Sequence, residues 1–544
     1  MSESKPKVSQ QEQMMRGTAW SAAGNFISRL LGVVYIIPWY LWMGQHADEA
    51  NALFTQGYNI YSLFLLISTS GLNVAVAKQI AKYNAMDKQA ETLQLIREFL
   101  KLMLFLGLLS AGIMYLLSPV IANLSGAGSE LIPVIRSLSW SVLIFPVMSV
   151  IRGVFQGHND LAPFAKSQVA EQLIRVIWML LTAYFVMQIG SGNYVTAVTQ
   201  STFAAFLGML ASMAVLVYYL AKAKLLKPLF FDRHKDITVD AKALLVETLK
   251  EAIPFIITGS AIQVFSLIDQ FSYVPFMKVI TTYNRSDLLV QFAYFASNPN
   301  KIVMLLVSVA GSIGGVGIAL LTENHVKKDM IAAARLITNN LQMLFMFIMP
   351  AIVGILILAK PVYTIFYGAP SPMALGLFVA AMIQTLFLAL YIMLSPMLQA
   401  MFENRKAMRY FAYGLVTKVI LQLPLIYLFH GYGPLIATSM ALAVPIALSY
   451  RRLEDLTPIN ALGLSRRLQL INLMTVLMAL PVGLVTLGLG MFLNPASRLH
   501  SVLYVIIVGG VGILSYGYMS LKTRMLDKLI GGRAHRLREK CRIS

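Results

Sequence analysis

The stretch GTAWSAAGNFISRLLGVVYIIPWYLWM, from Gly17 to Met43, is an apolar run that is interrupted near its middle by Arg29. The run is longer than the roughly 20 residues that an α-helix needs to cross a hydrocarbon core of about 30 Å. A guanidinium at membrane depth costs at least about 2.5 to 3.5 kcal/mol, so such a residue usually faces a water-filled cavity and has a function. The stretch therefore predicts a membrane-spanning helix that carries a functional cation.

The composition extends this prediction to the whole chain. Hydrophobic residues make up 58% of the 544 residues, charged residues make up 12%, and the mean hydropathy is +0.69, values that exclude a soluble globule. Alternating strand patterns are absent, which disfavours a barrel. The expected spans centre near residues 31, 65, 110, 143, 175, 207, 264, 306, 346, 387, 417, 441, 480 and 510. We predict an all-α polytopic membrane protein with about 14 transmembrane helices.

Lysine and arginine gather in alternate gaps between the expected spans. The basic segments are 5–16, 78–97, 222–235, 327–328, 405–409, 451–467 and 522–542. Because cytoplasmic loops carry the excess of Lys and Arg, both termini are predicted to be cytoplasmic in a multi-pass protein of the cell membrane. Trp39, Tyr40 and Trp42 are then expected to form an aromatic anchor at the outer membrane interface.

The net charge of +20 does not indicate nucleic-acid binding, because the cations are spread over loops on one membrane face. Topology and attraction to anionic lipid headgroups explain them. The polar segment before Gly17 lacks the features of a cleaved signal peptide, so the first helix is expected to stay in the membrane. The single cysteine, Cys541, excludes an internal disulfide and a multi-cysteine metal site. We predict no nucleic-acid partner, no metal and no cofactor.

Two local similarities indicate an internal repeat. Residues 70–77 (SGLNVAVA) resemble residues 314–321 (GGVGIALL), 244 positions later, and residues 155–159 (FQGHN) resemble residues 402–404 (FEN) at an offset of 245. The two offsets agree, which predicts two six-helix halves in parallel repeat, with cargo bound at their interface, plus a C-terminal helix pair. The expected segments are an N-terminal segment 1–14, a first half 15–225, a linker 226–243, a second half 244–455, a helix pair 456–522 and a basic tail 523–544.

Charged residues within the apolar runs indicate what is bound. The residues inside or at the edge of these runs are Arg29, Arg152, Arg175, Asp269, Lys301 and Lys418. The set is mainly cationic, so the expected cargo is anionic. A pyrophosphate cannot cross hydrocarbon unaided, and arginine offers a planar fork of donors that suits phosphate oxygens. We take Arg29, Lys301, Arg152, Arg175 and Asp269 as candidate substrate-binding residues, with Arg29 and Lys301 as a clamp drawn from the two halves.

Each candidate also has an alternative interpretation. Arg29 forms an internal ion pair with a carboxylate such as Asp269, or Asp269 binds a coupling cation instead. Lys301 follows Asn298-Pro299-Asn300 and lies either in a cavity or at a helix break near the surface. Arg152 and Arg175 both lie toward the cytoplasmic ends of their helices, and Arg152 is expected to extend toward lipid headgroups. The sequence leaves these alternatives open.

Three passages carry a resemblance to a known family: Ser28–Gly32 (SRLLG), Arg152–Asp160 (RGVFQGHND) and Gln168–Val176 (QVAEQLIRV). With them, nearly the whole chain resembles the multidrug, oligosaccharidyl-lipid and polysaccharide exporter superfamily, and within it the MurJ-like lipid II flippases of the Gram-positive YtgP and SpoVB branch. The resemblance implies alternating access around a V-shaped cavity that holds a pyrophosphate and sugar headgroup. Arg29 matches a cavity arginine of this family. A second family arginine falls on Tyr35, so the cation set is partly rebuilt here.

These observations predict a non-enzymatic flippase for undecaprenyl-pyrophosphate-linked peptidoglycan precursor (lipid II). A flippase for capsule or wall-polysaccharide lipids is the alternative, and a multidrug exporter is third because a drug-cation site favours carboxylates and aromatics. A membrane-embedded glycosyltransferase is disfavoured, since no loop exceeds about 25 residues and no catalytic acidic cluster is evident. The expected partners are a lipid-linked anionic glycan, membrane lipids and, as candidates, cell-wall synthesis proteins.

Overall fold

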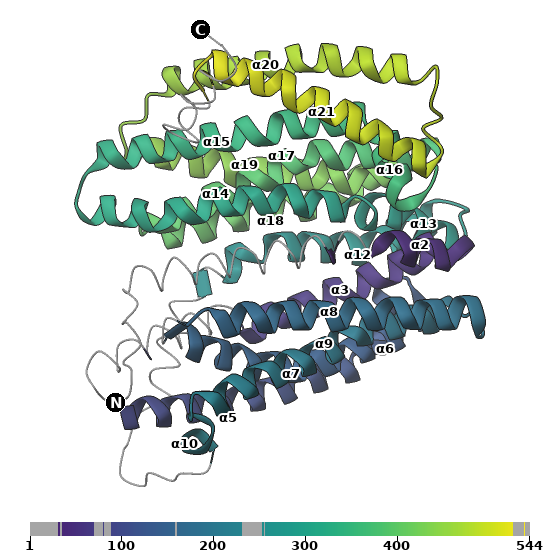
Figure 1. Cartoon of the computed structure of the whole chain (residues 1–544), viewed down its shortest axis with the longest axis vertical. Coiled ribbons are helices and arrows are strands. Elements are labelled where there is room, and N and C mark those ends of the chain that lie inside the picture. The colour runs from purple at the N-terminus through teal and green to yellow at the C-terminus, as the bar shows by residue number, and fades with distance from the viewer. Residues whose placement is uncertain are drawn as a thin grey trace, which may run out of the picture. The chain divides into compact units, whose positions relative to one another are not determined.

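The computed structural model describes residues 31–32, 35–69, 80, 89–157, 160–230, 253–254, 256–525 and 538 (Figure 1). These described residues form helices joined by turns and contain no strand, which confirms the predicted all-α membrane fold. The chain divides into two compact units, Met1–Pro275 and Phe276–Ser544. Most of the predicted linker, 226–243, lies outside the described residues, so the predicted segment boundaries stay predictions.

In the first unit, α7 is the helix around which the others pack. Its helices are α2 (Ile36–Met43), α3 (Ala47–Thr69), α5 (Gln89–Leu116), α6 (Ser118–Leu124), α7 (Leu131–Gly157), α8 (Ala162–Tyr184), α9 (Tyr194–Lys222), α10 (Leu226–Phe230) and most of α12 (Ala261–Ile280). The short 3-10 helices η1 (Gly44–His46) and η2 (Gly128–Glu130) precede α3 and α7, and the π-helix η3 (Phe185–Ile189) follows α8 directly. Helix α7 contacts α3, α5 and α9, while α8 packs along α9.

In the second unit, α17 has the corresponding place. Its helices are α13 (Arg285–Phe292), the π-turn η4 (Ala293–Ser297), α14 (Asn300–Val326), α15 (Met330–Ile357), α16 (Ala359–Tyr367), α17 (Pro372–Ala400), α18 (Asn404–Phe429), η5 (His430–Tyr432), α19 (Gly433–Leu456), α20 (Ala461–Leu489) and α21 (Arg498–Lys522). Helix α17 contacts α14, α15 and α19, and α18 packs along α19. Each unit thus has the same order of helix packing, which supports the predicted repeat.

The predicted spans coincide with the observed helices. Every predicted centre from residue 65 to residue 510 falls inside a described helix, and the first centre, residue 31, lies at the edge of the described ranges. Within the described residues, 10 helical stretches are long and apolar enough to cross a membrane, with α18 and α19 in one stretch. Helices α3 and α12 fall outside this set because polar residues such as Gln56, Asn59 and Gln270 lower their hydropathy.

The polar residues of α3 and α12 bond to each other inside the first unit. Asn59 Nδ2 donates to Gln270 Oε1 at 3.1 Å, and Gln270 Nε2 donates to Ser125 Oγ at 2.9 Å. Gln270 and Ser125 are fully buried. Because a buried amide without a partner costs free energy, these bonds are what allow such polar helices to lie within the bundle.

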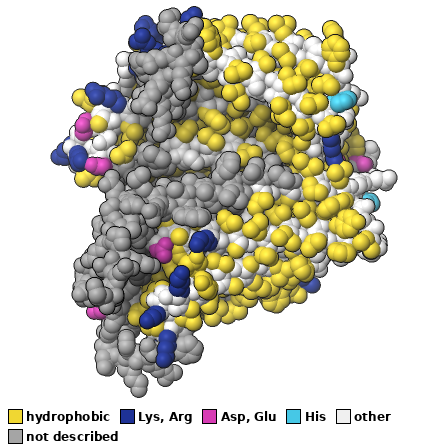
Figure 2. All heavy atoms as spheres, in the orientation of Figure 1, with side chains coloured by type: hydrophobic (Ala, Val, Ile, Leu, Met, Phe, Trp, Pro, Cys, Tyr) yellow, Lys and Arg dark blue, Asp and Glu magenta, His cyan; other side chains and the backbone are white. Residues whose placement is uncertain are grey.

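Hydrophobic side chains cover much of the described surface that is visible in Figure 2. Many of them are large, and on α20 and α21 Leu484 and Ile513 are 70% and 76% exposed. Apolar patches of this extent are rare on soluble proteins, whereas lipid tails solvate them. The surface therefore supports the membrane location.

The expected aromatic anchor is wrong for Trp39 and Tyr40, which are buried. Trp39 Nε1 donates to Ser201 Oγ on α9 at 2.9 Å, and the Trp39 ring packs edge-on against Phe54 at 5.9 Å. The indole N–H finds its partner inside the protein because α2 packs against neighbouring helices, so it has no need of the membrane interface.

Candidate functional site

Arg152 on α7 is the centre of a buried polar cluster. Its Nε donates to Ser167 Oγ at 3.3 Å, and its Nη2 donates to Glu171 Oε2 at 2.8 Å and to Ser212 Oγ at 2.9 Å. The guanidinium also lies 5.5 Å from the centre of the Phe164 ring. These contacts join α7 to α8 and α9 and compensate the arginine charge with a carboxylate.

The expectation that Arg152 extends to lipid headgroups is therefore wrong. Its side chain is only 8% exposed. Two serines on the facing helices, Ser167 and Ser212, leave room for the guanidinium and accept its hydrogen bonds. A buried charge needs such a set of partners, because desolvation otherwise costs several kcal/mol.

Arg175 lies one helical turn after Glu171 on α8, and its partner is different. Its Nη2 donates to the Tyr58 hydroxyl of α3, and the guanidinium lies 5.0 Å from the centre of the Tyr58 ring. Tyr58 in turn stacks on Phe54 at 4.5 Å and meets Tyr61 edge-on at 5.4 Å. Among the described residues, no carboxylate lies within ion-pair distance of Arg175. The tyrosine thus holds the cation in place without neutralising it.

A glycine on α9 fixes the position of this segment of α8. A Cβ on Gly208 would lie 2.6 Å from the Glu171 carbonyl oxygen and 3.2 Å from Arg175 Cβ. Only a residue without a side chain permits this approach of two helix backbones. The segment that carries both charged residues is therefore held firmly against α9.

Lys301 lies in the first turn of α14, directly after a break in the helix. The π-turn η4 ends at Ser297, and α14 begins at Asn300. Buried Asn298 occupies the break, where its Nδ2 donates to the Tyr363 hydroxyl at 2.7 Å and its carbonyl accepts from the Tyr367 hydroxyl. Lys301 is partly buried, and its predicted role in substrate binding stays a prediction.

The remaining candidates are only partly visible. Arg29 and most of the passage Ser28–Gly32 lie outside the described residues, so the predicted pair of Arg29 with Asp269 lies outside them too. Asp269 is partly buried on α12, beside the hydrogen-bonded Gln270. The structure thus places Arg152 and Arg175 on neighbouring helices of one unit, with Glu171 paired to Arg152 and Tyr58 bonded to Arg175.

Four residues of this site are absent from the predicted binding residues: Tyr58, Ser167, Glu171 and Ser212. A signal for Glu171 was present, since it precedes Arg175 by four residues, the spacing at which helix side chains meet. No sequence pattern indicates Tyr58 or Ser212, because both come from other helices. Lys418 is a further charge within an apolar run, for which no role is predicted. It is fully buried on α18, and its Nζ donates to the Pro434 carbonyl at 3.1 Å and to Thr438 Oγ1 at 2.6 Å.

The chain is similar to known proteins over nearly its full length. The chain is 29% identical to the lipid II flippase MurJ of Bacillus subtilis (strain 168) over 534 residues, which cover 96% of this chain and 97% of that protein. Its fold is similar to a structure of the lipid II flippase MurJ in an inward closed conformation, with a TM-score of 0.64, 16% identity and coverage of 94% of this chain and 99% of that one.

A second solved structure, an inward-facing multidrug resistance transporter of the MATE family, matches with a TM-score of 0.56 and 18% identity over 80% of this chain and 95% of that one. The family model for polysaccharide biosynthesis proteins matches residues 14–325, more than half of the chain. The chain therefore belongs to the polysaccharide biosynthesis protein family.

Proposed function

We propose that this protein is a non-enzymatic flippase that moves lipid II from the inner to the outer leaflet of the cell membrane by alternating access. The observation that carries the proposal is the similarity to a lipid II flippase over nearly the full length of both chains. The transmembrane bundle and its intramembrane arginines fit such a role, because a lipid-linked diphosphate needs a cationic path through hydrocarbon.

Arg175 is the described cation best suited to an anionic headgroup. It is partly exposed, and its hydrogen-bond partner, the Tyr58 hydroxyl, is neutral. A phosphate oxygen accepts a stronger hydrogen bond from guanidinium than a phenol does. We keep Arg29 and Lys301 as the proposed clamp, Arg152 as a residue that supports the site, and Asp269 as a counter-charge or a coupling-ion ligand.

The proposed orientation has cytoplasmic termini and is supported by the distribution of charge in the second unit. The turns α14–α15, α17–α18 and α19–α20 lie at one end of this antiparallel bundle. The described cations at this end include Lys327, Lys328, Arg335, Arg405, Lys406, Arg409, Arg451, Arg452, Arg466, Arg467, Lys522 and Arg524. The opposite end has few cations, among them Lys360 and Arg498. We assign the basic end to the cytoplasm.

Depletion of the protein in its own cells tests the proposed cargo. Lipid II is expected to accumulate on the cytoplasmic face, and a wild-type copy is expected to restore export. An Arg29→Ala copy of equal membrane abundance is expected to fail. Accumulation of another lipid-linked glycan, with lipid II at its normal level, would contradict the proposal.

A flippase for capsule or wall-polysaccharide lipids is the second candidate, and the description of the matching family as polysaccharide biosynthesis proteins favours it. Both cargoes are polyprenyl diphosphates, so the arginine chemistry serves either. The identity of the lipid that accumulates on depletion separates them. Cell-wall synthesis proteins stay a predicted class of partner.

A further inference from the structure

Glu171 and Arg175 have the spacing of a helical ion pair but do not pair with each other. A glutamate four residues before an arginine on one helix normally meets it. Here Glu171 instead contacts Arg152 of α7 at 2.8 Å, and Arg175 contacts Tyr58 of α3. Arg152, Glu171 and Arg175 together carry a net charge of one positive unit. This charge lies on Arg175, because Arg175 has no carboxylate partner among the described residues.

The two arginines differ in how far their donors are used. Arg152 donates to three acceptors, and its side chain is 8% exposed. Arg175 donates to a single described acceptor, Tyr58, and is partly exposed, although a guanidinium has five N–H groups. The donors of Arg152 are therefore occupied by acceptors of the protein itself, whereas Arg175 has N–H donors that can bind a ligand.

We propose that Arg152 is a positioning residue, which holds Glu171 away from Arg175 so that Arg175 stays free to bind the diphosphate of a polyprenyl-linked substrate. The inference rests on the proposed function, because it takes a diphosphate lipid as the cargo. It assigns roles to Glu171 and Tyr58 as well. Glu171 is the carboxylate that Arg152 keeps from pairing with Arg175. Tyr58 is the neutral hydrogen-bond partner of Arg175, and a substrate phosphate replaces it.

The physical reason is the cost of an unpaired carboxylate at this depth. The Glu171 side chain is only 18% exposed, so without Arg152 it needs another cation. The nearest described candidate on its own helix is Arg175, one turn away. That pairing would cancel the charge that attracts the substrate and place a carboxylate where phosphate oxygens must bind.

Binding of undecaprenyl diphosphate to the purified full-length protein in detergent tests the inference, with undecaprenol as the uncharged comparison. Arg152→Gln is expected to weaken binding of the diphosphate by about tenfold, the effect of losing one favourable charged contact. Adding Glu171→Gln to Arg152→Gln is expected to restore affinity to within about twofold of wild type, because no carboxylate is left to occupy Arg175. A double variant as weak as Arg152→Gln would overturn the inference, since Arg152 would then act through packing alone.

A second pair of variants tests the inference if Arg152→Gln alone does not fold. The comparison of Glu171→Gln with Glu171→Gln/Arg152→Gln then tests the same idea, and equal affinities for undecaprenyl diphosphate are expected. A severalfold loss on adding Arg152→Gln would reject it. Thermal unfolding of each variant shows whether it is folded.

Lys166 supplies the matched control. It lies on α8 and, like Arg175, donates to a tyrosine hydroxyl, that of Tyr219, at 2.8 Å, but it is exposed and lies nine residues before Arg175. Lys166→Gln is expected to bind undecaprenyl diphosphate as wild type does, and a tenfold loss there would mean that any cation on α8 matters. The probe lacks sugar and peptide, so its binding reports only on the diphosphate site. If the variants bind undecaprenyl diphosphate as expected but a wild-type copy does not restore lipid II export in depleted cells, the proposed function is refuted and this inference stands.

Discussion

At the scale of single residues, the buried cations show how differently a membrane bundle uses positive charge. Lys418 donates to the Pro434 carbonyl and the Thr438 hydroxyl, groups four residues apart on α19. If the amine is removed, the threonine hydroxyl can bond the carbonyl of its own preceding turn. We therefore expect Lys418→Met to change the melting temperature in detergent by only a few degrees, roughly 1 kcal/mol or less.

Lys418→Ala provides the contrast. It leaves a cavity, and the expected loss of unfolding free energy is about 2 to 4 kcal/mol. Equal melting temperatures for Lys418→Ala and Lys418→Met would refute this account. A Lys418→Met protein that melts normally but exports no lipid II would show that the charge itself has a function.

At the scale of helices, close backbone contact between α8 and α9 depends on Gly208. Gly208→Ala would place a methyl group 2.6 Å from the Glu171 carbonyl, which is backbone and cannot turn away. We expect a loss of about 1 to 3 kcal/mol in unfolding free energy, and weaker diphosphate binding because Glu171 and Arg175 move. Gly112→Ala on α5 is the control, since nothing lies within 4 Å of its added Cβ. A Gly208→Ala protein as stable as that control would contradict the prediction.

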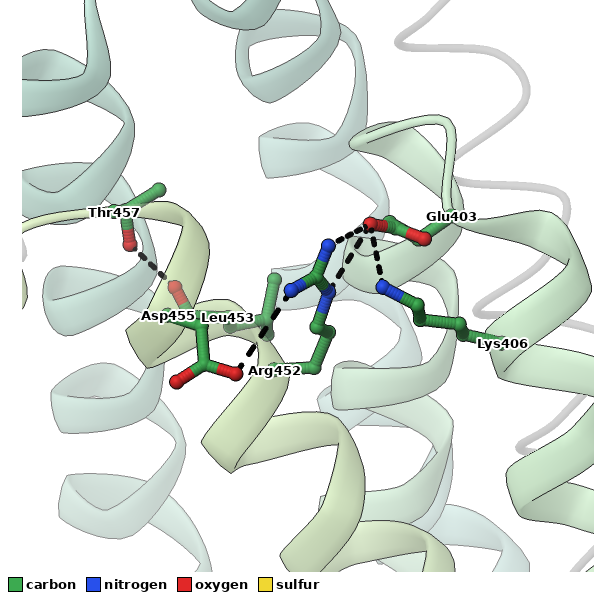
Figure 3. A network of polar contacts seen from close by, with 6 residues as sticks. All are labelled: Glu403, Lys406, Arg452, Leu453, Asp455 and Thr457. Carbon is green, nitrogen blue, oxygen red and sulfur yellow. Dashed lines mark hydrogen bonds and ion pairs between the residues drawn. The ribbon is translucent and has the colours of Figure 1, made fainter.

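An ion network joins the turn between α17 and α18 to the end of α19 (Figure 3). Glu403 Oε1 accepts from Arg452 Nε at 3.0 Å and from Lys406 Nζ at 3.2 Å, and Arg452 Nη1 lies 3.9 Å from Asp455. Partial burial by itself would raise the pKa of Glu403, but the hydrogen bonds from Arg452 and Lys406 outweigh it and lower the pKa below 4.5.

This lowered pKa predicts how stability depends on pH. A carboxylate with a lower pKa in the folded state stabilises above its unfolded pKa, and the contribution is lost as pH falls through the folded value. We expect Glu403→Gln to be less stable than wild type by about 0.5 to 1 kcal/mol at pH 7, because the side chain is 20% exposed and partly screened. The difference should shrink as pH falls below about 4.5. Melting curves at pH 7 and pH 4 check it, and a constant difference would refute it.

At the scale of the whole molecule, the charge distribution predicts which ends of the helices face the cytoplasm. In a protein with Cys541 replaced by serine, Arg466→Cys places a single exposed thiol near the start of α20, and Asn494→Cys places one in the loop that follows its other end. An impermeant maleimide is expected to label Asn494→Cys in intact cells and Arg466→Cys only after lysis. The reverse pattern would invert the proposed orientation.

The sequence predicted the helices far better than it predicted the contacts of the site. The length of an apolar run is a local property, so spans such as α7 and α15 could be located from the sequence alone. The partners of Arg152 and Trp39 come from serines on other helices, and which helix faces meet is decided by tertiary packing. For the same reason Arg175 could be proposed as a binding residue, but its tyrosine partner could not.

The polar character of α3 has a consequence for biogenesis. A translocon releases a segment into lipid according to its hydrophobicity, and amides such as Asn59 disfavour that release. Asn59 bonds to Gln270, which is 211 residues further along the chain and is therefore synthesised much later. Until Gln270 has been synthesised, the Asn59 amide needs another hydrogen-bond partner, such as water or the translocon. We therefore expect α3 to insert stably into the bilayer only after α12 has emerged from the ribosome.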